Sequence, residues 1–137
     1  MSARADPTPA PPAPSKSRVL ALAGRPNTGK TTLFNALTGL NHRVANFHGT
    51  TVEQASVVME CPGRAPVEIV DLPGTFSLLP ASIDEKVALE FLLVAAQEGD
   101  LRVLCLSEAS NLANDLTFAL GLKDCGFQVF LALNMID

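Results

Sequence analysis

Short apolar segments alternate with amphipathic segments along most of this chain, beginning at Arg18. Compact runs of valine, leucine and alanine are typical of buried strands, whereas apolar residues spaced three or four apart indicate helices. Two helices carry end signals, because Gly39 follows the first and the capping box Ser82-Ile83-Asp84-Glu85 opens the second. The pattern predicts strands at 19–23, 52–60, 67–70, 101–106 and 127–133, and helices at 30–38, 82–96 and 111–124.

This alternation of strands and helices predicts one small α/β domain. Parallel strands need crossover helices, so we expect a mostly parallel sheet that is covered on both faces. Residues 52–60 and 67–70 form a predicted hairpin around the turn CPGRAP, which would make an antiparallel edge, and the polar residues 41–51 are expected to form a loop. Ligands of such sheets bind at the carboxyl ends of strands, so motifs that directly follow strands should share one rim.

Composition sets limits on the class of protein. Residues 1–17 are rich in proline and alanine and have little to bury, so we expect a disordered tail before a partial domain at 18–137. The net charge of -4 gives no electrostatic reason to expect a nucleic acid partner. No apolar run is long enough for a membrane span and no signal peptide is apparent, so the chain itself is expected to be soluble.

The stretch GRPNTGKT follows the first predicted strand, opens the first predicted helix and fits the phosphate-loop pattern GxxxxGK[ST]. Glycines allow successive N–H groups to point at phosphate oxygens, and the helix start adds a favourable dipole. Lys30 would reach the β- and γ-phosphates, and the Thr31 hydroxyl would bind Mg²⁺. A chance match is the alternative, and the strand–loop–helix context argues against it. The candidate phosphate-binding residues are Gly24, Arg25, Pro26, Asn27, Thr28, Gly29, Lys30, Thr31 and Thr32.

A second motif, DLPG, directly follows the apolar run VEIV. A carboxylate at that strand end can hold a Mg²⁺-bound water, and Gly74 allows its N–H to approach a γ-phosphate. The following loop would then sense whether the γ-phosphate is present. A simple turn is the alternative. The candidate residues are Asp71, Leu72, Pro73 and Gly74.

The sequence GTTVE, within the polar segment after the first helix, is a candidate switch. A threonine there can close over Mg²⁺ when a γ-phosphate is bound, and a turn leading into a strand is the alternative. Chemistry alone does not choose between the two threonines. The candidate residues are Gly49, Thr50 and Thr51.

The last four residues, NMID, follow the final predicted strand and are a candidate for base recognition. The Asp137 carboxylate can accept hydrogen bonds from N1–H and the N2 amino group of guanine, which adenine does not offer, so GTP and GDP are the expected ligands. Asn134 would bond base or loop atoms and brace the site. The candidate residues are Asn134, Met135, Ile136 and Asp137.

These motifs resemble the G1, G2, G3 and G4 elements of a small GTPase domain with the P-loop NTPase fold. The run GRPNTGKTTLFNALTG alone is similar to several bacterial GTPases, including those of ribosome assembly. The segments HRVANFHGTTVE, DLPGTFSLLP and SIDEKVALEFLL together resemble the N-terminal G domain of FeoB-type ferrous iron transporters. The resemblance covers residues 18–137 and implies a domain that regulates ferrous iron transport.

The resemblance also implies roles for particular residues. Thr51 matches the last threonine of the family's GxTVE, so it would be the switch threonine that joins Thr31 and Asp71 around Mg²⁺. Asn27 matches the asparagine of PNxGK, which binds K⁺ in potassium-dependent members, although it could also only brace the loop. The implied catalytic residues are Lys30, Thr51 and Gly74.

Hydrolysis is expected to be slow. Thr75 and Phe76 follow DLPG where other GTPases place a glutamine, so no side chain is assigned to orient the attacking water. We expect turnover near or somewhat above the roughly 10⁻⁴ to 10⁻³ s⁻¹ of an unassisted GTPase. The fourth predicted strand ends in LCLSEAS, so Glu108 stands where the family usually has an aspartate, and no role is assigned to it.

The family pattern continues beyond Asp137 with a helix, a strand carrying the G5 loop and a last helix, so we expect a truncated G domain with an exposed final strand. By resemblance its partners are a helical regulatory domain and a transmembrane iron permease, at the cytoplasmic face of the inner membrane. A soluble ribosome- or tRNA-associated GTPase and a non-catalytic nucleotide-binding fragment are the alternatives. An ATP-using P-loop enzyme is disfavoured by NMID.

Overall fold

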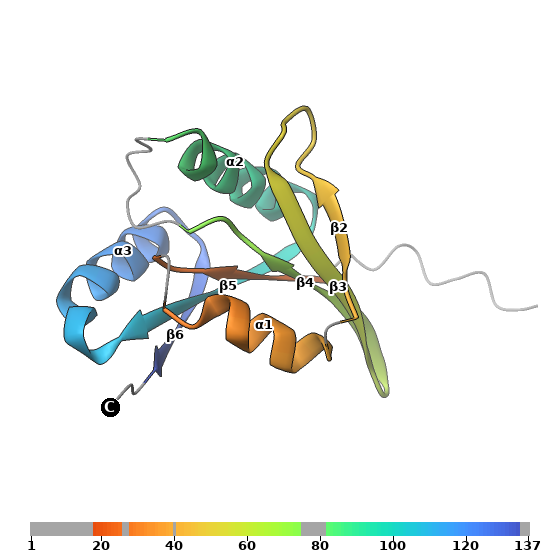
Figure 1. Cartoon of the computed structure of the whole chain (residues 1–137), viewed down its shortest axis with the longest axis horizontal. Coiled ribbons are helices and arrows are strands. Elements are labelled where there is room, and N and C mark those ends of the chain that lie inside the picture. Colours follow the sequence, from red (N-terminus) through yellow and green to blue (C-terminus); the bar gives the residue numbers. More distant parts are fainter. Residues whose placement is uncertain (1–17, 26–27, 40, 75–81, 135–137) are drawn as a thin grey trace, which may run out of the picture.

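A computed structural model describes residues 18–25, 28–39, 41–74 and 82–134 (Figure 1). Helices and strands alternate along these residues as the hydrophobic pattern predicts. In chain order the elements are β1 (Arg18–Ala23), α1 (Lys30–Thr38), β2 (Arg43–Asn46), β3 (Glu53–Cys61), β4 (Arg64–Asp71), α2 (Ile83–Glu98), β5 (Asp100–Glu108), a 3-10 turn (Ala109–Asn111), α3 (Leu112–Asp124) and β6 (Gln128–Asn134).

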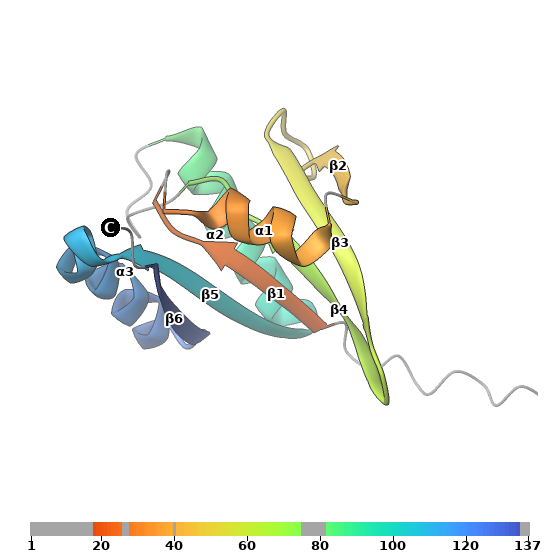
Figure 2. The same cartoon turned by 60° about the horizontal axis from the view of Figure 1, so that its bottom comes forward.

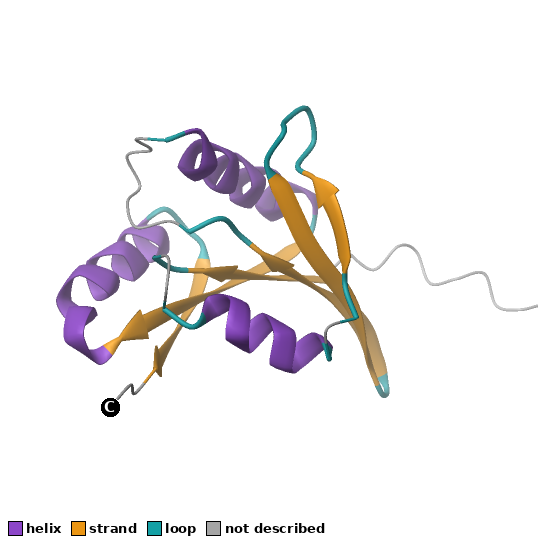
Figure 3. Cartoon of the chain, in the orientation of Figure 1, coloured by secondary structure: helices purple, strands orange, loops and turns teal. Residues whose placement is uncertain are grey.

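The strands of the described residues form one mixed sheet in the order β2-β3-β4-β1-β5-β6. Strands β4, β1, β5 and β6 are parallel, whereas β3 runs antiparallel to both of its neighbours. The predicted α/β class with a mostly parallel sheet is therefore confirmed. Leu22 lies beside Asp71, and Glu108 lies beside Asn134, so the ends of the parallel strands meet at one rim. Figure 3 shows the loops after β1 and β4 leaving the sheet on this side.

Helix α1 covers one face of the sheet, and α2 and α3 cover the other (Figures 1 and 2). Alternate residues of β1 supply both layers because successive side chains of a strand point to opposite faces. Leu22 packs with Phe34 of α1, whereas Ala21 and Ala23 belong to a larger cluster with α2 and α3. The small Ala21 and Ala23 of the central strand β1 thus pack in the same core cluster as residues of α2 and α3.

The prediction of a loop over 41–51 is wrong for residues 43–46, which form β2 and pair with β3. As a result β2 is the edge of the sheet, and the hairpin of β3 and β4 lies inside it. All four residues of β2 are exposed, so the segment has no buried face and shows no alternation of polar and apolar residues. Val52, predicted as the start of the next strand, lies in the bend before β3.

The helix ends follow their predicted signals. Ser82 accepts a hydrogen bond from the Glu85 N–H at 3.1 Å, and Gly39 ends α1 in the left-handed conformation. Helix α2 extends past the predicted end to Glu98, and α3 begins at Leu112 because residues 109–111 form the 3-10 turn. No helix of the described residues combines the length and the apolar character that a membrane span requires.

Candidate functional site

Between β1 and α1 the chain turns from the sheet to the helix that covers it, and the structure describes Gly24, Arg25, Thr28 and Gly29 of this GRPNTGKT turn. Gly24 and Gly29 have φ angles of 150° and 92°, which side-chain-bearing residues rarely adopt. A Cβ atom on Gly24 would lie 2.9 Å from the Leu106 carbonyl oxygen of β5, and one on Gly29 would lie 2.5 Å from Asn134 Nδ2. The turn therefore needs glycine at both positions. It leads directly into α1, whose first N–H groups form a positively polarised end.

Lys30 joins this turn to the end of β4. Its Nζ donates hydrogen bonds to Asp71 Oδ1 at 2.7 Å and to the Leu72 carbonyl oxygen. Lys30 is buried and the Asp71 side chain is 15% exposed, so the ammonium lies in a site sheltered from water. The first two predicted motifs thus meet through one charged pair.

Asn134 joins the turn to the end of β6. Its Nδ2 donates to the Thr28 carbonyl oxygen at 3.0 Å, although 106 residues separate the two in sequence. Thr28 is fully buried, and its hydroxyl donates to the Arg25 carbonyl oxygen at 3.0 Å. The beginning of NMID therefore holds the middle of GRPNTGKT in place. Pro26, Asn27, Thr75, Phe76 and residues 135–137 lie outside the described residues.

The predicted switch segment forms a compact turn over residues 47–52, here called the switch turn. Phe47 N–H donates to the Val52 carbonyl oxygen at 2.9 Å, which closes it. The Thr50 hydroxyl donates to the Phe47 carbonyl oxygen at 2.8 Å and accepts from Val52 N–H at 3.1 Å. Thr51 is exposed, and its hydroxyl makes no hydrogen bond to any residue that the structure describes.

The switch turn packs against α2 and the core of the sheet through Phe47 and Val52. Phe47 is buried, and its ring meets that of Phe91 edge to face with centroids 5.5 Å apart. A cavity of about 440 Å³ lies beside this contact, with Thr50 and Val87 also in its lining. No hydrogen bond or ion pair joins Gly49, Thr50 or Thr51 to the described residues of GRPNTGKT.

Other predicted residues are placed as follows. Thr31 and Thr32 are exposed at the start of α1, where their hydroxyls are accessible. Pro73 and Gly74 follow Leu72 beyond the end of β4, and Leu72 itself is buried with its N–H bonded to the Leu22 carbonyl oxygen. The described phosphate-loop residues, Asp71 and Asn134 are thus gathered at one rim of the sheet.

Comparison with known proteins agrees with this arrangement. The family profile of ferrous iron transport protein B matches residues 18–137. The chain belongs to this family. It is 42% identical over 122 residues to the Fe(2+) transporter FeoB of Leptospira biflexa, and 41% identical over 127 residues to that of Escherichia coli K12. These alignments cover 89% of the chain but 17% and 16% of the two relatives, so the chain spans about a sixth of their length.

Solved FeoB structures share the fold. The G domain of the T. maritima FeoB iron transporter superposes with a TM-score of 0.74 at 42% identity, covering 85% of this chain and 71% of that one. A mutant of S. thermophilus NFeoB bound to GDP gives a TM-score of 0.74 at 43% identity, covering 88% and 45%. The chain is therefore a FeoB G domain with the P-loop GTPase fold.

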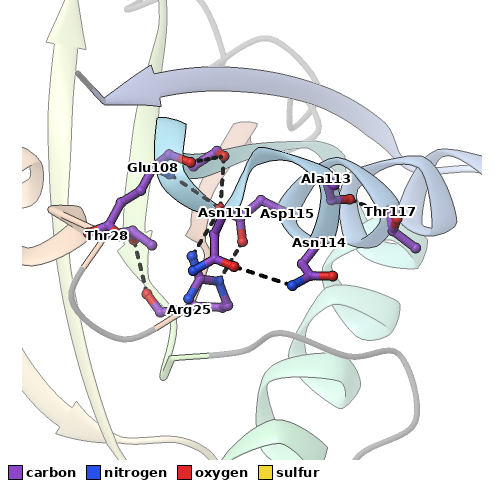
Figure 4. Close-up of polar contacts among 9 residues, drawn as sticks. Arg25, Thr28, Glu108, Asn111, Ala113, Asn114, Asp115 and Thr117 are labelled. Carbon is purple, nitrogen blue, oxygen red and sulfur yellow. Dashed lines mark hydrogen bonds and ion pairs between the residues drawn. The ribbon is translucent and has the colours of Figure 1, made fainter. Parts of the chain in front are cut away.

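One polar cluster of this FeoB G domain was not predicted. Arg25 donates to Asp115 at the start of α3, and Ser107 and Glu108 also donate to that carboxylate (Figure 4). The hydrogen bonds from Arg25 hold the pKa of Asp115 below its ordinary value, and the same contact raises the pKa of Arg25. A sequence signal existed, because Asp115, Ala119 and Leu122 occupy the buried stripe of α3.

Burial makes the neighbouring thiol unreactive. It raises the pKa of Cys105 to about 12, with a smaller contribution from the negative charge of Asp115. A thiol with so high a pKa carries almost no thiolate at neutral pH. Cys105 therefore serves as packing between β5 and the helices.

Proposed function

We propose that this FeoB G domain binds GTP and GDP, hydrolyses GTP slowly and thereby regulates passage of ferrous iron through the rest of the transporter. The observation that carries the proposal is the meeting of three nucleotide motifs through Lys30 and Asn134. Further support comes from a relative that is described as bound to GDP. In the whole protein the domain would lie at the cytoplasmic face of the membrane, next to helical regulatory and transmembrane permease domains.

Phosphate binding would use the glycine turn and Lys30. Gly24 and Gly29, both with positive φ, would allow backbone N–H groups to point toward phosphate oxygens, and the N-terminus of α1 adds positive potential. Lys30 now neutralises Asp71. An incoming phosphate would offer the ammonium a second anionic partner, so binding would redistribute the hydrogen bonds of Lys30 between Asp71 and the nucleotide.

The residues present fit a magnesium ion. Thr31 and Thr51 have exposed hydroxyls, and Asp71 provides a partly exposed carboxylate, which are oxygen donors of the kind that Mg²⁺ prefers. Bound there, Mg²⁺ would neutralise developing phosphate charge. Thr51 is the better switch candidate because the hydroxyl of Thr50 is engaged within its own turn. Asn27 would hold K⁺ beside the phosphates, and Asp137 would read guanine.

Release of the γ-phosphate would then free the switch turn and the loop after Gly74. Lys30, Thr51 and Gly74 are the proposed catalytic residues, since each would contact the γ-phosphate or its metal. Lys30 and Asp71 form their ion pair within a sheltered rim, so interactions with phosphate there would be less screened than on an open surface. Turnover would stay slow, because no glutamine follows DLPG and no side chain is assigned to orient the attacking water.

The test is a titration of fluorescent GDP and ADP analogues with Mg²⁺ present. We expect selective binding of GDP. Lys30→Met keeps a long buried side chain but removes the charge, and should weaken GDP binding about tenfold to a hundredfold. Lys123→Met changes an exposed lysine of α3 and serves as the matched control, with binding unchanged. Equal binding of GDP and ADP, or no effect of Lys30→Met, would contradict the proposal.

A further inference from the structure

The carboxylate of Asp115 binds Arg25 of the candidate phosphate-binding loop, which is residues 24–31. Asp115 is 5% exposed, and its two oxygens accept from Arg25 Nε at 2.6 Å and from Arg25 Nη2 at 3.2 Å. Ser107 Oγ and Glu108 N–H complete the set at 2.8 and 3.3 Å. Figure 4 shows these contacts converging between α3 and the loop. A buried carboxylate is costly unless it is paired and hydrogen-bonded, and here both oxygens have donors.

Arg25 is held at both its side chain and its backbone. It follows Gly24, which packs closely against the Leu106 carbonyl oxygen, and its own carbonyl accepts from the Thr28 hydroxyl at 3.0 Å. Thr28 is in turn bonded by Asn134. A continuous path of hydrogen bonds therefore runs from α3 through the loop to the end of β6. Since two guanidinium nitrogens face Asp115, Arg25 shapes the loop and does not present a free charge to a ligand.

We propose that Asp115 is a positioning residue for phosphate binding, which acts by holding Arg25 so that the loop is already formed when a nucleotide arrives. The proposal rests on the proposed function, because it takes the phosphates of a guanine nucleotide as the ligand of this loop. A preorganised loop loses less conformational entropy on binding. Removing the pair should therefore weaken nucleotide binding in protein that is still folded.

The experiment uses the full chain and the fluorescent GDP titration. Arg25→Ala and Asp115→Ala should each raise the Kd for GDP about tenfold or more, because each removes the two charge-assisted hydrogen bonds between Arg25 and Asp115. The double variant should bind about as weakly as either single one, since the pair acts as a unit. Where Asp115→Ala does not fold, Asp115→Asn replaces it, because it keeps the side-chain shape and an acceptor oxygen.

A second ion pair provides the matched control. Arg102 donates to Asp100 at 2.9 Å at the opposite end of β5, away from the phosphate-binding rim. Arg102→Ala and Asp100→Ala should leave the Kd for GDP within about twofold of the wild-type value. Urea unfolding at the titration temperature establishes the folded fraction of every variant, so that lost affinity is not confused with lost structure.

The Kd values for GDP and GMP, measured by competition, distinguish a loss of loop geometry from a general loss of stability. Loss of loop geometry should raise the Kd for GDP more than the Kd for GMP, because GDP has an additional phosphate in the loop. Folded variants that bind GDP within about twofold of wild type, or lose GDP and GMP affinity equally, would overturn the inference. An equal loss of GDP affinity in Arg102→Ala and Asp100→Ala would also overturn the inference. Wild-type protein that binds no guanine nucleotide would instead refute the proposed function on which the inference rests.

Discussion

The phosphate-binding loop and the switch turn lie at the ends of different elements and are held in different ways. The loop is fixed by contacts with residues distant in sequence: Lys30 with Asp71, Arg25 with Asp115 90 residues away, and Asn134 with Thr28. The switch turn is closed by hydrogen bonds among residues 47–52, and Phe47 anchors it in the core beside Phe91 of α2. The loop is held by polar contacts with residues distant in sequence, whereas the hydrogen bonds described for the switch turn are all local.

This difference suits the proposed function, because a nucleotide switch needs one segment that binds phosphate and another that responds to it. A loop that receives phosphates gains affinity from being formed in advance, because little entropy is then lost on binding. A segment that reports on the γ-phosphate must change its position at small cost. The hydrogen bonds described within the switch turn are separate from those that pair β2 with β3, and a cavity of about 440 Å³ lies beside Phe47 and Phe91. The contrast can be tested by substitutions on each side.

The largest effect is expected at Gly24. Gly24→Ala places a side chain at φ 150° and brings Cβ to 2.9 Å from a backbone oxygen that cannot easily move. It should lower the free energy of unfolding by about 1–3 kcal/mol and should also weaken GDP binding. Urea unfolding and the GDP titration measure the two effects.

Gly39→Ala is the control for strain alone. Gly39 also has a positive φ, 65°, but nothing lies within 4 Å of the position where a Cβ would be built. This variant should lose about 1–2 kcal/mol of stability and keep its affinity for GDP. If both variants bind GDP like the wild type, the close packing of the loop on β5 has no bearing on phosphate binding.

A smaller effect distinguishes the two threonines of the switch turn. Thr50→Ala removes both hydrogen bonds that its hydroxyl makes to Phe47 and Val52, and should cost about 1 kcal/mol of stability. Thr51→Ala changes an exposed side chain and should alter stability by less than about 0.5 kcal/mol while lowering Mg²⁺-dependent GTP hydrolysis. Thermal unfolding and a phosphate-release assay provide the two measurements. A reversed pattern would assign the switch role to Thr50.

Much of this arrangement could be predicted from sequence because buried strands and helix ends leave local signals. Gly39 and Ser82 mark helix ends, and apolar runs mark the parallel strands whose ends carry the motifs. The β2 strand could not be found in this way, because it is exposed throughout and is defined only by pairing with β3. Edge strands of this kind depend on a partner, not on their own pattern.

The candidate site, like the fold, could be predicted from the sequence only in part. The neighbourhood of Lys30, Asp71 and Asn134 followed from the rule that parallel strands end at one rim. The contact between Arg25 and Asp115 did not, because an aspartate in the first turn of a helix is ordinarily explained by the helix dipole. Only the three-dimensional packing shows that this carboxylate points toward the loop. Chemistry alone did not choose between Thr50 and Thr51. The family resemblance favoured Thr51, and the hydrogen bonds of the Thr50 hydroxyl within the turn support that proposal.

The smallest effect concerns the pH dependence of the loop anchor. The Arg25 hydrogen bonds lower the pKa of Asp115 in the folded protein from its ordinary value of 3.8, which is retained after unfolding. The folded state therefore binds the carboxylate proton less readily than the unfolded state does. The stabilisation is complete above pH 3.8 and is lost as the pH falls through the lower folded pKa.

Asp115→Asn removes this titration and keeps the shape of the side chain. The gap in unfolding free energy between wild type and Asp115→Asn should be constant near neutral pH and should narrow as the pH falls below 3.8 toward the lower pKa of the folded protein. Urea unfolding across that range measures the gap. Asp100→Asn, which removes a carboxyl from the ion pair with Arg102, controls for the loss of one negative charge. If the gap narrows equally for both variants, the pH dependence of the unfolding free energy comes from overall charge. The contact between Arg25 and Asp115 would then contribute none of it.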